Sequence, residues 1–524
     1  MDIAGQSRAR VDLRAGFVGD RAWRWLAGPV EAVRLDNGST DGLEELDVVV
    51  IAARSDDDTV SPQAALDEAR VKGVRTVVVG SANDDDSWCA DADLWLGGRG
   101  LPSLPPVPAA VTPVERRWDP DPRAAIVLHQ ALDKAALGVV EDLRKRAPVG
   151  AVDVVSVVDQ PPELAQQLEV RRESGAPEQV LRWLQPYRLV LDHPDLHRSP
   201  WTRTTWLTTV AAGGVAVSVG KLAPSERQLL GLLAPALEHV DPQDLDDLDA
   251  IGLHSVEARR RALSCHDVMA RWQLVAELLD LPLPAPRSVT GVLVTNRPDF
   301  LEFAAEQVAA IDQAAFDVVL GLHGHGFPDG AAERFAKAQR NPVTVLRLPE
   351  SLSFGSALNE ACAAGEGELL TKIDDDDWYG PKHVQDLVLA WATSGADLVA
   401  KGAEFVHLDE LDLTIRRYRK GGDSSSRTVA GGTLLFGRDA LERAGGFRDV
   451  PRTVDQFLID DVLASGGTIH RTHGYGYVLR RHGHGHTWES DADYFLRHSD
   501  SQYRGLRLDV AGVAWRPPRS GHGS

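Results

Sequence analysis

The stretch Glu368-Leu-Leu-Thr-Lys-Ile373, followed by Asp374-Asp-Asp-Asp377 and then Trp378-Tyr-Gly-Pro381, decides the fold prediction. The mostly apolar run predicts a strand, and the aspartates follow directly where it ends. In an open α/β sheet, ligands bind outside the carboxyl ends of the strands. Oxygen ligands crowded there suit Mg²⁺ or Mn²⁺ holding a substrate diphosphate. A solvated acidic turn is the alternative, and the flanking strand favours the ligand-binding interpretation.

Strand and helix patterns alternate on both sides of this stretch. Apolar runs predict strands at 291–295, 316–322 and 343–348, and apolar residues at helical spacing predict helices at 300–311, 330–339 and 355–364. Pro381 stands at a plausible first helical position before a further helix at 382–393. This alternation predicts one doubly wound α/β domain over residues 286–500, with the aspartates after its fourth strand.

The amino-terminal half shows the same alternation in two blocks. Strands are predicted at 46–52, 74–80, 152–158 and 187–192, with helices at 62–72, 177–184 and 255–279, and a helix end and strand within 204–220. Proline-rich stretches at 101–122 and 281–286 separate the blocks. We therefore predict a Rossmann-like lobe at 1–120, a second at 121–285, and a carboxyl-terminal tail at 501–524.

Composition excludes several classes of protein. A chain of 524 residues is too long for one hydrophobic core. Its net charge of -21 argues against binding nucleic acid, and its three cysteines lack the paired spacing of disulfide or zinc sites. The amino terminus lacks the apolar region of a secretory signal, and the longest uncharged stretch is too short to span a membrane. We predict a cytoplasmic protein, with any membrane contact peripheral and at the inner face.

Motifs around the acidic run follow one another in a fixed order. Thr295-Asn-Arg-Pro298 follows the first strand, and Gly355-Ser-Ala-Leu-Asn359 and Ala364-Gly-Glu-Gly-Glu368 precede the aspartates. In this order they resemble the GT-A glycosyltransferases of family 2, over about residues 289–488. The resemblance implies a GT-A fold, a nucleotide-sugar donor and a divalent metal, Mn²⁺ or Mg²⁺. The aspartate run contains the family's DxD motif.

The resemblance also implies roles for individual residues of the donor side. Asp376 is expected to be the principal metal ligand, and Asp374 to orient the ribose or the metal's water shell. Asp375 is assigned to the donor side and Asp377 is less certain. Because alternate side chains at a strand end face opposite ways, one of these two is open to being merely solvated. The turn containing Thr295, Asn296 and Arg297 is expected to contact the nucleotide.

A general base is implied on a helix farther along the chain. In the resembling family an Asp opens a helix after a Gly-Gly-Phe turn, and here Gly445-Gly-Phe447 precedes Asp455. We therefore expect Asp455 to be the base, although it would also make a good helix N-cap. The family's Glu is replaced by Val454. Asp460 and Asp461 are expected at the surface.

The histidine-rich and arginine-rich tail of this domain supplies further candidates. In many relatives a His in this region closes the metal site, and His486 is the preferred candidate, with His484 second. An exposed loop with the same pattern is an open alternative. Arg480 and Arg481 are expected to clamp the diphosphate, because a guanidinium matches phosphate oxygens bidentately.

Two glycine-containing segments concern the acceptor and the recognition of the nucleotide base of the donor. Gly431-Gly-Thr433 resembles the acceptor-side loop of the fold, so Gly432 is a candidate that lets the backbone approach a sugar; a plain turn is the alternative. Many relatives carry a base-reading carboxylate after the second strand, where this chain has Leu322-His-Gly-His-Gly326. Base selection then rests on backbone groups or on Asn296 and Arg297, and UDP is not assured.

We predict a metal-dependent, inverting glycosyltransferase that moves a sugar from a nucleotide-sugar to a saccharide or lipid-linked acceptor, for a cell-surface polysaccharide. Residues 121–285 weakly resemble the nucleotide-binding half of GT-B glycosyltransferases. One alternative is a nucleotidyltransferase, although residues 291–299 lack its glycine-rich basic loop. Another is a non-catalytic saccharide-binding scaffold. The donor sugar, the linkage and the oligomeric state are left open.

Overall fold

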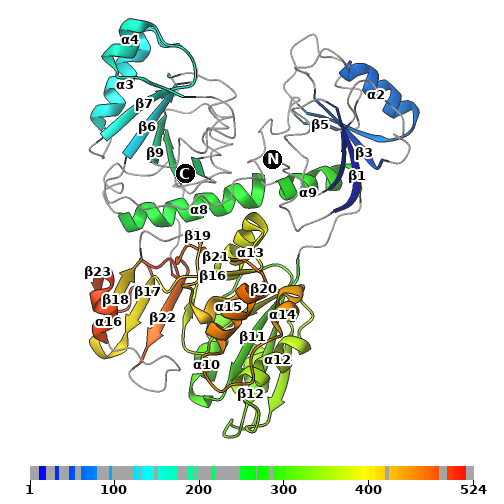
Figure 1. Cartoon of the computed structure of the whole chain (residues 1–524), viewed down its shortest axis with the longest axis vertical. Helices are drawn as coiled ribbons and strands as arrows, with labels where there is room; N and C mark the ends of the chain where they lie inside the picture. Colours follow the sequence, from blue (N-terminus) through cyan, green and yellow to red (C-terminus); the bar gives the residue numbers. More distant parts are fainter. Residues whose placement is uncertain are drawn as a thin grey trace, which may run out of the picture. The chain divides into compact units, whose positions relative to one another are not determined.

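The computed structural model describes residues 11–18, 30–34, 46–52, 61–79, 92, 94–96, 123–128, 131–146, 151–173, 187–192, 196, 209–210, 214–218, 248–266, 268–281, 287–418, 424–482 and 492–514. The chain divides into two compact units, whose main boundary in the sequence lies near residue 285. Figure 1 draws both, coloured along the sequence. Each unit is described by itself.

The first unit contains two parallel sheets. Their strand orders are β2-β1-β3-β4-β5 and β10-β9-β6-β7-β8. The strands are β1 (Val11–Val18), β2 (Val30–Arg34), β3 (Val48–Ala52), β4 (Arg75–Val79), β5 (Leu94–Leu96), β6 (Arg123–Leu128), β7 (Ala151–Ser156), β8 (Arg171–Arg172), β9 (Tyr187–Asp192) and β10 (Val215–Ser218). In chain order, the second sheet reads fifth-fourth-first-second-third, which is the order of the first five strands of a Rossmann sheet. The predicted Rossmann-like α/β class is confirmed for both sheets.

The described helices of the first unit correspond to the predicted helices at 62–72 and 255–279 and include two that were not predicted, at 134–146 and 162–167. They are α2 (Pro62–Val71), α3 (Lys134–Arg146), α4 (Pro162–Gln167), α8 (Leu248–His266) and α9 (Val268–Leu279). Helix α2 connects β3 and β4, which pair in parallel, so residues 48–79 form the predicted βαβ unit. The helix predicted at 177–184 lies outside the described residues.

The second unit is built on an eight-stranded sheet with the order β13-β12-β11-β14-β20-β16-β21-β19. Its strands are β11 (Val289–Thr295), β12 (Phe316–His323), β13 (Val343–Leu348), β14 (Leu369–Lys372), β16 (Leu398–Lys401), β19 (Ser424–Ser425), β20 (Leu435–Gly437) and β21 (Ile469–Thr472). The first four are parallel, and β20 is antiparallel to β14 and β16. The doubly wound domain with the aspartates after its fourth strand is therefore confirmed.

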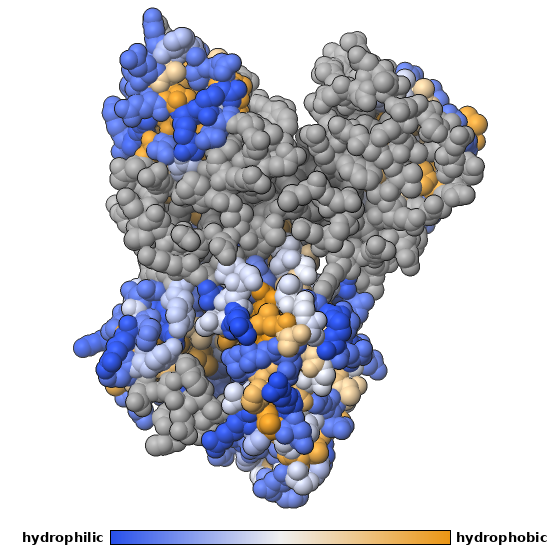
Figure 2. Space-filling view, in the orientation of Figure 1, coloured by the Kyte–Doolittle hydropathy of each residue, from blue (hydrophilic) through white to orange (hydrophobic). Residues whose placement is uncertain are grey.

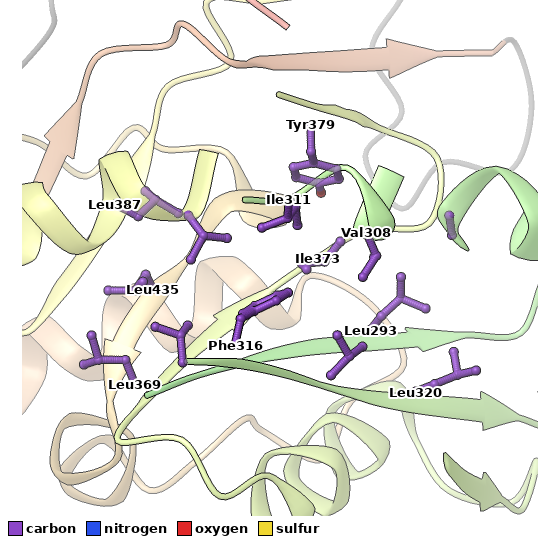
Figure 3. Packing of buried hydrophobic residues seen from close by; sticks show 14 of the residues in the cluster. Leu293, Val308, Ile311, Phe316, Leu320, Leu369, Ile373, Tyr379, Leu387 and Leu435 are labelled. Carbon is purple, nitrogen blue, oxygen red and sulfur yellow. The ribbon is translucent and has the colours of Figure 1, made fainter. Parts of the chain in front are cut away.

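Helices cover both faces of this sheet. One apolar cluster joins the sheet to α10 (Leu301–Ala309), α11 (Ala331–Ala338) and α13 (His383–Ser394), and the other joins it to α12 (Phe354–Ala364), α14 (Arg438–Ala444) and α15 (Val454–Ala464). Within β11, Leu293 faces the first cluster and Val292 the second, as the period of a strand requires. Figure 3 shows part of the first cluster, where Phe316 and Ile373 pack with Val308 of α10. Each such side chain contributes about 1.5–3 kcal/mol when fully buried.

A second sheet in this unit was not predicted from the sequence. Its order is β15-β22-β17-β18-β23, with β15 (Trp378–Tyr379), β17 (Phe405–Leu408), β18 (Leu413–Arg417), β22 (Tyr477–Arg481) and β23 (Ser499–Arg504). Helix α16 (Ala492–Arg497) packs on it through Phe495. Strand β23 pairs with β18 and crosses residue 500, so the predicted tail boundary at 501 is wrong: the domain extends into the 501–524 segment.

Helix α13 begins at His383, so Pro381 lies before the helix and not at its first position. The Pro381 carbonyl accepts a hydrogen bond from the amide of Asp312.

The visible face of this unit in Figure 2 mixes hydrophilic and hydrophobic residues. None of the helices that the structure describes is both long and apolar enough to cross a membrane.

Candidate active site

The acidic run lies at the point where the order of the parallel strands reverses. Strand β11 pairs with β12 on one side and with β14 on the other, so the carboxyl ends of β11 and β14 are neighbours. Thr295 is the last residue of β11, and Asp374–Asp377 form the bend between β14 and β15. Ligands of open α/β sheets bind at such a switch point. The predicted donor turn and the aspartates are thereby brought together.

Arg297 is the cation at the centre of the donor side. Its guanidinium forms an ion pair with Asp375, with Nε 3.1 Å from Oδ2, and a second one with Asp376, where Nη1 lies 2.9 Å from Oδ2. The hydroxyl of Thr295 also donates to Asp375. The Arg297 guanidinium lies 4.6 Å from the ring centre of Phe300. Asn296, the other predicted member of this turn, is exposed.

Asp376 has a histidine partner that the sequence did not single out. The Nε2 atom of His482 lies 3.0 Å from Asp376 Oδ2. Burial opposes ionisation of Asp376, but Arg297 and His482 lower its pKa below the ordinary value. The preferred candidates His486 and His484 lie outside the described residues, so their ligation stays a prediction. His482 opens the same histidine-rich run, directly after β22, and its place at a strand end was the available signal.

Neither Asp375 nor Asp377 is merely solvated, so that alternative is wrong. Asp375 is 5% exposed and Asp377 only 1%. Asp377 Oδ2 accepts a hydrogen bond from the Tyr477 hydroxyl at 2.6 Å, and Oδ1 accepts one from the Arg480 amide at 2.9 Å. Burial raises the pKa of Asp377 well above its ordinary value. The run is a bend and not a continuing strand, so strict alternation of its side chains does not apply.

The predicted base lies on the other side of the bend. Asp455 is in the first turn of α15, whose N-cap is Thr453, so the N-cap interpretation of Asp455 is wrong. The ammonium group of Lys372 lies 2.5 Å from Asp374 Oδ1 and 3.3 Å from Asp455 Oδ1. Burial raises the pKa of Asp455, while Lys372 lowers it. Asp455 Oδ1 accepts no hydrogen bond from the residues that the structure describes.

Two glycines pack against these carboxylates. A Cβ atom at Gly431 would lie 2.1 Å from Asp455 Oδ2, and one at Gly432 would lie 2.7 Å from Asp374 Oδ2 and 3.0 Å from Asp377 Oδ2. The Gly432 carbonyl accepts a hydrogen bond from the Tyr379 hydroxyl at 2.9 Å. Glycine is therefore required at both positions for the segment 431–433 to approach the aspartates this closely.

The predicted arginine clamps differ in their surroundings. Arg480 donates through Nε to Asp409 at 2.8 Å and lies over the ring of Trp378. Arg481 is partly buried, which lowers its pKa, and the charges of Asp376 and Asp377 oppose that shift. Both remain candidates for a diphosphate, and Arg481 is the one whose charge acts on the acidic bend.

The donor set fits a divalent cation that is shared with a substrate. No group of three or more His, Cys, Asp or Glu side chains suited to a metal occurs in the part of the chain that the structure describes. Mg²⁺ is commonly held by one or two carboxylates together with substrate phosphates, without an all-protein cage. Asp376 and His482 lie together, and the side chain of Asp374 is 31% exposed. These residues can supply such a partial ligand set.

Comparison with known proteins matches part of this site, the donor turn and the acidic bend, to a family model. Residues 292–426 match the model described as "Glycosyl transferase family 2". The comparison with curated proteins found no match. Two solved structures are similar. One is S. aureus TarS in complex with UDP-GlcNAc, with 14% sequence identity, a TM-score of 0.31, and 40% of this chain and 64% of that chain covered. The other is the mannosyltransferase PcManGT from Pyrobaculum calidifontis in complex with GDP-Man and Mn²⁺, with 17% sequence identity, a TM-score of 0.29, and 44% of this chain and 67% of that chain covered.

The extent of these matches limits what they establish. The chain spans less than two thirds of the TarS chain. The family match lies wholly within the second unit, so the resemblance of residues 121–285 to GT-B enzymes stays a prediction. The family match includes the donor turn and the whole acidic bend, which lie at the ends of the neighbouring strands β11 and β14 of the eight-stranded sheet. The chain therefore carries, in residues 292–426, a family 2 glycosyltransferase domain with a GT-A type fold.

Proposed function

We propose that the chain is a metal-dependent, inverting glycosyltransferase that moves a sugar from a nucleotide-sugar to a saccharide or lipid-linked acceptor, in the synthesis of a cell-surface polysaccharide. The observation that carries this proposal is the meeting of two carboxylate sets at one sheet edge. Asp375 and Asp376 lie with Arg297 on the donor side, and Asp374 and Asp455 share Lys372.

The donor side suits a nucleoside diphosphate. Asp376 and His482 would hold Mg²⁺ or Mn²⁺, which would supply Lewis-acid charge to the departing diphosphate. The charge of Arg481 interacts with those of Asp376 and Asp377, and its guanidinium can pair with phosphate oxygens. Asn296 is exposed beside this edge and is free to contact the nucleotide by hydrogen bonding.

Asp455 suits the role of general base. The acceptor hydroxyl oxygen would form a bond to the anomeric carbon while the bond from that carbon to the phosphate oxygen breaks. The electron pair of that bond leaves with the nucleoside diphosphate, and the hydroxyl proton passes to Asp455. Burial raises the pKa of Asp455, which brings a carboxylate nearer to the strength that a base needs. A single displacement of this kind inverts the anomeric configuration.

The test is metal-dependent turnover of nucleotide-sugars by the full chain. A panel of UDP- and GDP-sugars is incubated with Mn²⁺ or with EDTA, and release of the nucleoside diphosphate is followed, because slow hydrolysis needs no known acceptor. We expect release from at least one donor, lost in EDTA and in Asp376→Ala. The control is Asp460→Ala, on the outer part of α15, where the side chain is 42% exposed. Equal turnover in Asp376→Ala and wild type would contradict the site; no turnover of any donor would contradict the activity.

A further inference from the structure

Lys372 is a buried cation that the proposed chemistry does not itself use. It is the last residue of β14, its side chain is 4% exposed, and its ammonium group contacts Asp374 and Asp455. Burial alone would lower the pKa of Lys372, but the two carboxylates outweigh it and raise the pKa. The two carboxylates in contact with the ammonium group favour its charged form.

Stability alone does not account for a lysine at this position. A buried ion pair often contributes no more to stability than well-packed apolar residues of the same volume, because desolvation of the charges costs several kcal/mol. The neighbouring positions Leu369, Leu370 and Ile373 are apolar and fully packed. Lys372 is the charged residue among them, and its ammonium group is paired with Asp374 and Asp455.

Those partners come from opposite halves of the site. Asp374 begins the acidic bend on the donor side, whereas Asp455 is on α15. Two carboxylates repel each other, and one ammonium group placed between them removes that repulsion. Gly431 and Gly432 also lie against these carboxylates, so closely that a Cβ atom at either position would collide with a carboxylate oxygen. Lys372 and this glycine pair together fix where both carboxylates lie.

We propose that Lys372 is a positioning residue for transfer: it holds Asp455 at a fixed distance from the donor-side carboxylate Asp374, so that the acceptor hydroxyl is placed in line with the anomeric carbon. This proposal rests on the proposed function and names a residue that acts through the base. Misplacement of a reacting group by about 1 Å can cost about 100-fold in rate. We therefore expect the charge of Lys372 to influence kcat for transfer much more than binding of the donor.

The test compares Lys372→Met and Lys372→Arg in the full chain. Lys372→Met should lower kcat about 10- to 100-fold and leave the Kd of the nucleoside diphosphate with Mn²⁺, measured by calorimetry, within about threefold. Lys372→Arg keeps the charge and should recover part of the lost rate. Lys401→Met is the matched control, because Lys401 is also buried and ion-paired, with Asp386. It removes a buried cation without touching Asp455.

A double variant separates positioning from general loosening. If Lys372 acts through Asp455, Lys372→Met combined with Asp455→Asn should be no slower than Asp455→Asn alone. A wild-type kcat in Lys372→Met, an equal loss in Lys401→Met, or a multiplicative loss in the double variant would overturn the proposal. If Lys372→Met does not fold, Lys372→Gln, which also removes the charge, decides by the same criteria, alone and with Asp455→Asn. Absence of any turnover by the wild type would instead refute the proposed function.

Discussion

Two buried lysines of the second unit end two strands of the same sheet that lie on either side of β20, yet they have different surroundings. Lys372 ends β14 and Lys401 ends β16, and both strands pair with β20. Lys401 and its partner Asp386 are 0% and 2% exposed, and we name this pair the sealed cluster. Lys372 has partners that are 31% and 29% exposed, Asp374 and Asp455, and these three form the open cluster.

The difference between the clusters shows where charge is available for chemistry. In the sealed cluster the ammonium group also donates to the carbonyl of Tyr475, and both charges are enclosed. Such a pair can only maintain the fold. In the open cluster the lysine is enclosed while its carboxylates reach solvent, so they can meet a substrate. Exposure of the partner, and not burial of the lysine, distinguishes a site from a core.

The largest expected effect is on the base of the open cluster. Asp455→Asn should lower kcat for transfer by about 10²- to 10⁴-fold, which is the usual contribution of a general base. Binding of the nucleoside diphosphate with Mn²⁺ should be nearly unchanged. Steady-state kinetics and calorimetry measure the two quantities. Full activity in this variant would remove the functional distinction between the clusters.

Breaking the sealed cluster should affect folding instead. Lys401→Met removes the ammonium group that pairs with buried Asp386, leaving His473 at 3.7 Å, and breaking a buried ion pair costs about 3–5 kcal/mol of unfolding free energy. Lys372→Met should cost less, because water can reach Asp374 and Asp455. Chemical denaturation followed by tryptophan fluorescence checks this order, with the exposed Lys382→Met as reference. The reverse order would show that exposure of the partners does not separate the clusters.

Crowding the open cluster from outside tests whether its geometry matters. Gly431→Ala places a methyl group where Asp455 Oδ2 now lies, so kcat should fall about 10- to 100-fold as the base is displaced. Gly138→Ala is the control, because a Cβ atom there meets no other atom within 4 Å. An unchanged kcat for Gly431→Ala would indicate that Asp455 acts from another position.

A smaller effect is expected at Asp377, which is buried although it belongs to the acidic bend. Both of its oxygens accept hydrogen bonds, and an Asn side chain offers only one acceptor oxygen. Asp377→Asn should therefore destabilise the second unit by about 1–3 kcal/mol. Thermal denaturation measures this, with Asp460→Asn as the exposed counterpart. A loss of activity without loss of stability would instead indicate that Asp377 acts in the reaction, like the carboxylates of the open cluster.

The smallest effect is a shift in pH dependence. Asp455 must be ionised to accept a proton, and burial raises its pKa, so transfer should fall on acidification at a higher pH than an ordinary Asp, near about 4, would give. Lys372 lowers that pKa, so Lys372→Met should move the acid limb of kcat/KM to higher pH. Lys401→Met should leave the limb in place. A limb that moves equally in both variants would contradict the comparison.

The sequence predicted most of the main sheet because its strands carry continuous local patterns. The apolar runs at 316–322 and 343–348 correspond to β12 and β13 almost residue for residue. The second sheet was not predicted because its strands hold buried cations: Arg416 and Arg417 are 1% and 2% exposed. They lie against aromatic rings contributed by distant residues, and local periodicity cannot reveal such partners.

The candidate site was predicted in its parts and not in its connections. The aspartates, the donor turn and Asp455 were identified from motifs, and the structure brings them to one edge of the sheet. Lys372 was treated as one residue of an apolar run, although it pairs with Asp455, 83 positions away in the sequence. His482 was passed over for His486. Both omissions concern contacts between residues distant in the sequence, which depend on how strands and helices assemble.

The hydrogen bond between the Arg480 amide and Asp377 has a consequence for His482, which lies beside Asp376, the proposed metal ligand. Because the Asp377 carboxylate grips the main-chain amide of Arg480, the strand is anchored to the acidic bend just two residues before His482. Only Arg481 separates this bonded amide from His482, so the hydrogen bond limits how far the His482 backbone can shift relative to the acidic bend.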